Sequence, residues 1–198
     1  MELIKLLLDE IKEWTEVLFI FNIPGRIGSR LRNLYMSVRM NKCGSLYSQT
    51  GCVVLSPKNI SIGKDVSMMR NCHLYAHDNG LIKAGDRLSL NNNVMIDAAG
   101  GGKIFIGNDV LIGPNVVIRA SNHTYKSKSV PINKQGHVGG EIVIEDDVWI
   151  GANTVLLPKT IIRKGSVIAA GSVVNSEIQS NSIAAGVPAK VIRTDVRV

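Results

Sequence analysis

The chain has 198 residues, of which 45% are hydrophobic, so it is long and apolar enough to bury one substantial core, and overall disorder is excluded. Aromatic residues make up only 5% while glycine numbers 19, which favours a narrow core of thin layers of small and β-branched side chains. The net charge of +7 permits nucleic acid, an acidic membrane surface or an anionic small molecule as a partner.

Cysteine usage and the N-terminal residues bear on the compartment. Cys43, Cys52 and Cys72 form an odd count without CxxC spacing, so neither a disulfide framework nor a zinc knuckle is indicated. Glu2 stands where a signal peptide would carry a basic region, and the longest apolar run, residues 17–21, is too short to span a membrane. We therefore expect a cytoplasmic protein without a signal peptide or a membrane span.

Residues 1–43 are predicted to form an N-terminal helical cap of two helices. Apolar residues recur at helical spacing in two stripes that Pro24 and Gly25 separate. The stripes are Leu3, Ile4, Leu7, Leu8, Ile11, Trp14 and Leu18, and then Ile27, Leu31, Leu34, Tyr35 and Val38. Residues 22–42 also carry five cations and no acid: Arg26, Arg30, Arg32, Arg39 and Lys42. A solvated helix face beside acidic neighbours is the simpler interpretation, contact with phospholipid is the alternative, and we expect no nucleic-acid partner.

From about residue 52 the helical period gives way to a six-residue repeat. One bulky aliphatic recurs in each unit, with Ala84 as the one weak position, and a small or medium side chain often follows four residues later. The repeated aliphatics are Ile62, Met68, Leu74, Leu90, Ile96, Ile106, Ile112, Ile118, Ile144, Ile150, Leu156, Ile162, Ile168 and Val174. Such a period predicts a mainly β solenoid, in which each unit supplies one short strand and one turn, and its aliphatic points inward.

The length of each coil locates the working edge of the solenoid. Residues 144–162 span 18 positions, or three units, whereas residues 62–84 and 84–106 each span 22. The longer coils therefore carry insertions at residues 75–83 and 97–105, and the next coil breaks at the same corner with an excursion over residues 119–141. Repeat proteins place insertions on one face, which is often the functional one.

Three stretches together resemble a known family: the repeats, the excursion RASNHTYKSKSVPINKQGHVGGEIVIEDDVWIGANTVLLP, and the closing AAGVPAKVIR. They are similar to the hexapeptide-repeat acyltransferases, above all to sugar and polysaccharide O-acetyltransferases related to maltose and galactoside acetyltransferases. The resemblance covers residues 44–193, with 194–198 as a tail. It implies a left-handed parallel β-helix, a homotrimer with active sites between subunits, acetyl-CoA as co-substrate and no required metal.

Acetyl transfer to a hydroxyl needs a base, and histidine is suited to this role near neutral pH. His73 ends a repeat and His77 lies in the first insertion, where solvated turn histidines are the ordinary interpretation. His137 lies among glycines at the returning end of the excursion. His123 stands five residues after Ile118, where the chain leaves the coil, and its NHTY context matches the position of the family's catalytic histidine.

The resemblance also implies roles for two further polar residues. Asn91, in the run NNNV, matches the asparagine that the family sets near the acceptor hydroxyl, where it would stabilise the oxyanion or bind the acceptor. A left-handed turn residue at a solenoid corner is the alternative interpretation of the same asparagines. Asp97, one repeat later, would orient the acceptor or the base, although DAAGGG departs from the family's pattern.

The other half of the site would hold CoA. By resemblance, the thioester end and the pantetheine arm would lie along VWIGA and IAAGS, and the phosphates on the basic residues of VPAKVIR. The residues concerned are Trp149, Gly151, Ala152, Ala170, Lys190 and Arg193. Packing explains the glycine and alanines equally well, interior or trimer packing would explain Trp149, and a solvated tail would explain the two cations.

Two other functions remain open at this point. A γ-class carbonic anhydrase uses the same solenoid with three zinc-binding histidines between subunits, but no second histidine is expected beside His123 at the required position. A non-catalytic scaffold would need neither the excursion nor the GVPAK tail. We therefore predict an O-acetyltransferase that acts on a sugar or on a surface polysaccharide such as capsule, lipopolysaccharide or exopolysaccharide. Similarity of residues 23–44 to cell-surface polysaccharide O-acetyltransferases adds the hypothesis of peripheral membrane contact.

Overall fold

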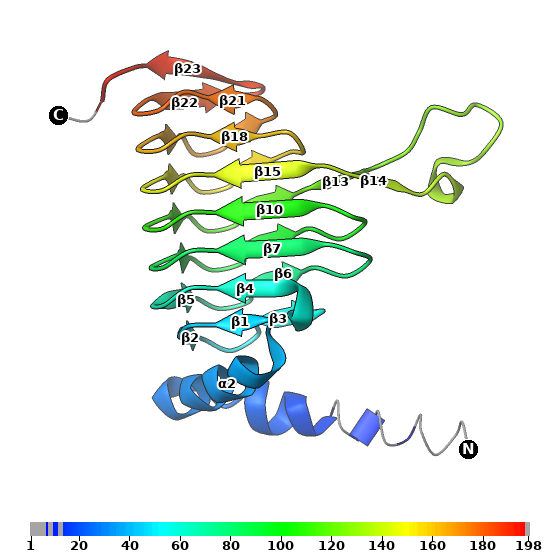
Figure 1. The fold of residues 1–198 in the computed structure, drawn as a ribbon, viewed down its shortest axis with the longest axis vertical. Helices are drawn as coiled ribbons and strands as arrows, with labels where there is room; N and C mark the ends of the chain where they lie inside the picture. The colour runs from blue at the N-terminus through cyan, green and yellow to red at the C-terminus, as the bar shows by residue number, and fades with distance from the viewer. Residues whose placement is uncertain (1–6, 8–9, 12–13, 197–198) are drawn as a thin grey trace.

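The computed structural model describes residues 7, 10–11 and 14–196, and this part of the chain winds as a parallel β-helix with short strands (Figure 1). Each complete coil contributes one strand to each of three sheets, named here A, B and C. Sheet A contains β1 (Lys42–Cys43), β4 (Ile60–Ile62), β7 (Leu81–Ala84), β10 (Lys103–Ile106), β15 (Glu141–Ile144), β18 (Ile161–Ile162) and β21 (Glu177–Ile178). Sheet B contains β2 (Leu46–Ser48), β5 (Val66–Met68), β8 (Ser89–Leu90), β11 (Leu111–Ile112), β16 (Trp149–Ile150), β19 (Val167–Ile168), β22 (Ile183–Gly186) and β23 (Ala189–Arg193). Sheet C contains β3 (Val53–Leu55), β6 (His73–Tyr75), β9 (Met95–Asp97), β12 (Val117–Arg119), β17 (Val155–Leu156) and β20 (Val173–Val174).

The interior of the solenoid confirms the six-residue period. All fourteen bulky aliphatics of the repeat are buried, and Ala84 is partly buried against them. The residues four positions later are buried as well where no insertion intervenes, and in the C-terminal coils several of them are hydroxyl residues. Their hydroxyls donate to backbone carbonyls, as Thr154 Oγ1 does to Gly151 O at 2.8 Å and Thr160 Oγ1 to Val174 O at 2.9 Å. The thin core therefore contains polar groups whose hydrogen bonds are satisfied.

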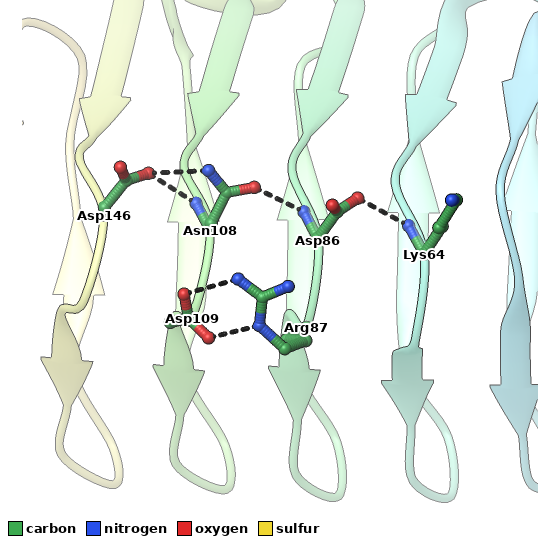
Figure 2. A network of polar contacts seen from close by, with 6 residues as sticks. All are labelled: Lys64, Asp86, Arg87, Asn108, Asp109 and Asp146. Atoms are coloured by element: carbon green, nitrogen blue, oxygen red, sulfur yellow. Dashed lines mark hydrogen bonds and ion pairs between the residues drawn. The ribbon is translucent and has the colours of Figure 1, made fainter.

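A ladder of polar side chains stabilises the corner between sheets A and B (Figure 2). Asp86 Oδ1 accepts a hydrogen bond from the Lys64 amide at 2.7 Å, and Asn108 Oδ1 accepts one from the Asp86 amide at 2.8 Å. Asp146 continues the ladder one coil further by accepting from the Asn108 amide at 2.6 Å. Glycine is required beside it, since a Cβ on Gly85 would lie 2.5 Å from Asn108 Oδ1. The glycine after many inward aliphatics thus leaves room for the next coil's side chain.

Two helices lie at the N-terminal end of the stack (Figure 1). Residues 14–16 are α-helical and continue into the π-helical turn η1 (Val17–Phe21), and α2 (Gly25–Arg39) packs on the first coil. Leu3, Ile4 and Leu8 of the predicted first stripe lie outside the described residues. No helix in the described ranges is long and apolar enough to span a membrane.

The basic stretch before the coils differs from the predicted solvated helix face at one position. Arg32 is buried, and its guanidinium donates to Ser48 O at 2.6 Å and to Ile23 O at 2.8 Å. Ile23 lies in the turn before α2 and Ser48 ends β2, the edge strand of sheet B, so the buried arginine supplies hydrogen bonds to backbone carbonyls at the start of the stack. Arg39 does pair with an acid, Glu16, at 3.1 Å, while Arg26 and Arg30 are exposed. Arg32 is therefore an anchor of the cap rather than a surface cation.

All three insertions connect sheet C to sheet A and stack at the corner between them. The longest begins as a hairpin of two antiparallel strands, β13 (Ser121–His123) and β14 (His137–Gly139), and its tip carries the 3₁₀ turn η3 (Ile132–Lys134). A second 3₁₀ turn, η2 (Pro57–Asn59), precedes β4. The amide of Gly101 donates to Asp78 O at 2.9 Å, which joins the first two insertions. In Figure 1 the hairpin projects well away from the stack.

Candidate functional site

The hairpin places two histidine rings in contact. His123 of β13 pairs in register with His137 of β14, and the ring centroids are 4.0 Å apart with the planes tilted by 41°. Both residues are exposed. A second histidine therefore does lie beside His123, because the antiparallel return of the excursion brings together positions that lie fourteen apart in the sequence, but the pair stands on the hairpin and not on one coil as the zinc enzyme requires. In the described ranges no group of three or more His, Cys, Asp or Glu is arranged to hold a metal ion.

The root of the hairpin is packed against the insertion of the preceding coil. A Cβ on Gly100, whose φ is +70°, would lie 3.1 Å from His137 Cβ and 3.6 Å from Ser121 Oγ. A Cβ on Gly139 would lie 2.3 Å from Gly101 O. Ser121 is fully buried, and its hydroxyl has no hydrogen-bond partner within the described part of the chain. The hairpin that carries His123 is therefore fixed at its root against the coil stack.

Asn91 lies at the corner between sheets B and C, and the three consecutive asparagines have different roles there. Asn93 takes the left-handed backbone conformation, with φ 60°, and its side chain joins an amide ladder by donating to Asn115 at 2.9 Å. Asn92 accepts from the Arg70 amide at 3.0 Å. Asn91 is exposed, and its Oδ1 accepts from the Asn92 amide at 2.7 Å. The turn interpretation therefore applies to Asn93, and Asn91 stays available for chemistry.

Asp97 lies in sheet C and is already engaged. Its side chain is 6% exposed, its Oδ2 pairs with Arg119 at 2.5 Å and its Oδ1 accepts from the Ala99 amide at 2.9 Å. In register beside it is Tyr75, whose hydroxyl lies 2.9 Å from Nδ1 of His73. Burial and then the negative charge of Asp97 raise the pKa of Tyr75. We refer to Tyr75, Asp97 and Arg119 as the sheet C row.

Sequence reasoning missed Tyr75 and Arg119, and it assigned His73 to a turn although His73 begins strand β6. The signal was present in the coil length, because residues 75, 97 and 119 are separated by 22 positions each and must therefore stack. His77 does lie in the first insertion, 3.6 Å from Asp78.

The residues predicted to bind CoA lie along sheet B and its corner with sheet C. Trp149 is 55% exposed and begins a row of register partners that continues through Val167 and Ile183 to Arg193. With neighbouring strands about 4.8 Å apart, this row is roughly 14 Å long. Lys190 and Arg193 are both exposed on β23. An aromatic ring therefore stands at one end of a partly apolar strip and two cations at the other.

Gly151, Ala152 and Ala170 occupy the adjoining corner, where coils approach closely. A Cβ on Gly151 would lie 2.5 Å from the Ala170 amide nitrogen, and one on Gly113 would lie 2.8 Å from that of Ala152. Packing thus requires glycine at position 151 whether or not a ligand binds there.

Apart from Asp97 in sheet C, the predicted residues form two separate groups within one chain. Asn91 and the CoA-binding candidates lie on sheet B and the B–C corner, whereas the hairpin of His123 leaves from the C–A corner. Sheet C, whose strands have two or three residues, separates the corners by roughly 7 to 10 Å. Among the described residues, no hydrogen bond or ring contact joins His123 to Asn91 or Trp149. A cavity of about 680 Å³ between the N-terminal helices and β3 contains none of the predicted site residues.

Comparison with known proteins identifies the family. Residues 141–176 match the family described as bacterial transferase hexapeptide (six repeats). The chain is 34% identical over 149 residues to WbbJ of Escherichia coli K12, an inferred lipopolysaccharide biosynthesis O-acetyl transferase, with 72% of this chain and 75% of WbbJ covered. The chain therefore belongs to the hexapeptide-repeat acyltransferases.

Two solved structures show the same architecture. A maltose O-acetyltransferase from Clostridium difficile 630 superposes with a TM-score of 0.64 at 25% identity, covering 96% of this chain and 88% of that one. A hexapeptide-repeat acetyltransferase from Vibrio cholerae, solved in complex with acetyl coenzyme A, gives a TM-score of 0.59 at 27% identity, covering 82% and 75%.

Proposed function

We propose that this protein is an acetyl-CoA-dependent O-acetyltransferase that acts on a hydroxyl of a sugar or surface polysaccharide. The observation that carries the proposal is the exposed imidazole of His123 on a hairpin whose root is packed into the coil stack. The names of the relatives support the acceptor class, since WbbJ is linked to lipopolysaccharide and another relative to maltose.

The reaction assigns a distinct task to each polar group. Acetyl-CoA supplies an activated acetyl group as a thioester. His123 accepts the proton of the acceptor hydroxyl as its oxygen bonds to the thioester carbonyl carbon, and Asn91 donates a hydrogen bond from its amide to the oxygen that becomes negative. As the carbon–sulfur bond breaks, His123 returns the proton to the departing sulfur. The products are the acetyl ester and CoA thiol.

Binding of the co-substrate is proposed for the row of register partners from Trp149 to Arg193, which we call the sheet B row. Trp149 would contact the thioester end beside Gly151 and Ala152, the arm would pass Ala170, and Lys190 and Arg193 would pair with the phosphates. Exposed cations can form charge-assisted hydrogen bonds with phosphate without the cost of burying them first. Tyr75 and Arg119 of the sheet C row are proposed to bind acceptor hydroxyls, with Asp97 holding the guanidinium in place.

We further propose that the active site forms between copies of the chain in a homotrimer. The separation of His123 from Asn91 and Trp149 within one chain supports this, since the base must come within hydrogen-bonding distance of the acceptor hydroxyl. Light scattering after size exclusion is expected to give three times the 21.5 kDa of one chain. An active monomer would contradict the shared site.

The test of the function is transfer of labelled acetyl from acetyl-CoA to a panel of sugars and glycan fragments. His123→Ala is expected to lower kcat by about 10² to 10⁴ and to leave CoA affinity unchanged. His77→Ala, which removes a histidine from an insertion at the same corner, is the matched control and should keep full activity. Wild-type kcat in His123→Ala would refute His123 as the base.

We propose separately that the protein is cytoplasmic and makes peripheral contact with a membrane through α2. Its outer face exposes Ile27, Leu34 and Val38, with 65% to 78% of each side chain accessible, beside the exposed Arg26 and Arg30. Apolar side chains flanked by cations are typical of helices that lie on anionic lipid. The full chain should cosediment with phosphatidylserine vesicles and the Ile27→Ser, Val38→Ser double variant should not. A changed oligomeric mass in that variant would assign the face to subunit contact instead.

A further inference from the structure

His123 and His137 form a contact that the mechanism above does not use. The two residues are directly opposite each other in the hairpin, with ring centroids 4.0 Å apart. Val138, the next residue on β14, pairs with Asn122 and is 58% exposed. Because neighbouring side chains of a strand point to opposite faces, His137 shares the face of His123 and Val138 does not.

The imidazole of His123 is exposed on a projecting hairpin, yet catalysis requires it to hold a defined orientation. A histidine free in solvent samples three χ1 rotamers, and only orientations that aim one ring nitrogen at the acceptor hydroxyl are productive. The ring of His137 occupies one side of the His123 ring and excludes the orientations that would overlap it. His137 is itself packed against the second insertion, because a methyl group added to Gly100 would lie 3.1 Å from His137 Cβ.

We propose that His137 is a positioning residue that holds the imidazole of His123 in its productive orientation by ring contact. This inference rests on the proposed function and deepens it. The chain of support runs from the second insertion through Gly100 to His137, and from His137 to the base. His137 takes no proton in this scheme, and the feature that matters is a flat ring at this position.

The experiment compares three variants in the acetyl-transfer assay with a chelator present, which removes any metal ion that could bridge the two imidazoles. His137→Ala is expected to lower kcat about 10-fold with the KM for acetyl-CoA unchanged, since orientation of the base is lost while the CoA face is intact. His137→Phe keeps a flat ring and should restore kcat to within about 3-fold of wild type. Val138→Ala, the matched control on the other face of the hairpin, should behave as wild type.

A spectroscopic readout separates positioning from loss of the hairpin. The chain has four histidines, so the ring protons of His123 can be assigned by NMR from single substitutions. Contact with a neighbouring ring shifts these resonances, and the shift should disappear in His137→Ala and persist in His137→Phe. Failure of Phe to restore kcat while the shift persists would overturn the proposal, and so would full kcat in His137→Ala.

The outcomes distinguish this inference from the function on which it rests. If His123→Ala is inactive and His137→Ala is fully active, only the positioning role fails. If His123→Ala is fully active, His123 is not the base and the positioning role fails with it. If wild-type protein transfers no acetyl group to any acceptor tested, the proposed function itself fails.

Discussion

Substitution of Arg119 tests whether its ion pair with the buried carboxylate of Asp97 stabilises the fold, and the chain offers a matched comparison. Two ion pairs each join an arginine to an aspartate 22 positions away, on neighbouring coils. In Arg119–Asp97 the carboxylate side chain is 6% exposed, whereas in Arg87–Asp109 both side chains are about half exposed, at 53% and 49%. The same truncation to alanine therefore removes an arginine–aspartate pair in two environments, a single contact for Arg119 and a bidentate one for Arg87.

The expected magnitude follows from what each variant leaves behind. Arg119→Ala leaves a buried carboxylate with one remaining recorded hydrogen bond, from the Ala99 amide. Removal of one partner from a fully buried pair costs about 3 to 5 kcal/mol, and the 39% exposure of Arg119 lets water reach the site and reduces this to about 2 kcal/mol. Arg87→Ala leaves its aspartate in water and should change stability little.

Urea denaturation measures the loss of stability in both variants. The protomer concentration is kept the same, because assembly contributes to the apparent stability. The midpoint should fall clearly for Arg119→Ala and stay near the wild-type value for Arg87→Ala, with the slope of the transition unchanged in both. Equal losses in the two variants would refute the reasoning from burial. A double variant, Arg119→Ala with Asp97→Ala, should recover part of the loss, since no uncompensated charge remains.

Three further predictions follow from the ladders and from the sheet B row. Gly85→Ala should cost about 2 kcal/mol in urea denaturation, because the new Cβ would lie 2.5 Å from Asn108 Oδ1, and an unchanged midpoint would contradict the close approach. Trp149→Ala should raise the KM for acetyl-CoA about 10-fold with little change in kcat, and a fall in kcat alone would move Trp149 out of the proposed CoA site. Hydrogen bonding to Arg87 lowers the pKa of Asp109 below its ordinary value of 3.8. The contribution of Asp109 to stability is therefore complete above pH 3.8 and is lost as the pH falls through the lower folded-state pKa. In an acid titration of stability, the small advantage of the wild type over Asp109→Asn should disappear in that range, and an advantage that grows with acid would contradict the lowered pKa.

The sequence predicts the coil well because its rule is local and repeated. A six-residue period specifies which side chain points inward regardless of which coils stack, so the positions from Ile62 to Val174 could be assigned without coordinates. Coil length locates the corner of the insertions by the same arithmetic. It would also have located Tyr75 and Arg119 beside Asp97, had the 22-residue spacing been applied to outward-facing positions.

The features that the sequence did not predict depend on contacts that the six-residue repeat does not specify. Arg32 is buried because its guanidinium donates to carbonyls of the preceding turn and of Ser48, and a helical pattern does not indicate such bonds. The pairing of His123 with His137 depends on the register of an irregular hairpin, in which a shift of one residue would place the two rings on opposite faces. The approach of His123 to the CoA face depends on how copies of the chain assemble.

The central claim is a shared active site for acetyl transfer, and subunit mixing tests it most directly. His123→Ala removes the proposed base, and the double variant Lys190→Glu, Arg193→Glu removes the proposed phosphate contacts, so each protein alone should be inactive. Dissociation and reassembly of an equal mixture should restore about a quarter of wild-type activity, since random pairing leaves that share of interfaces with both halves intact. No recovery in a mixture whose subunits have demonstrably exchanged would contradict an active site built from two copies.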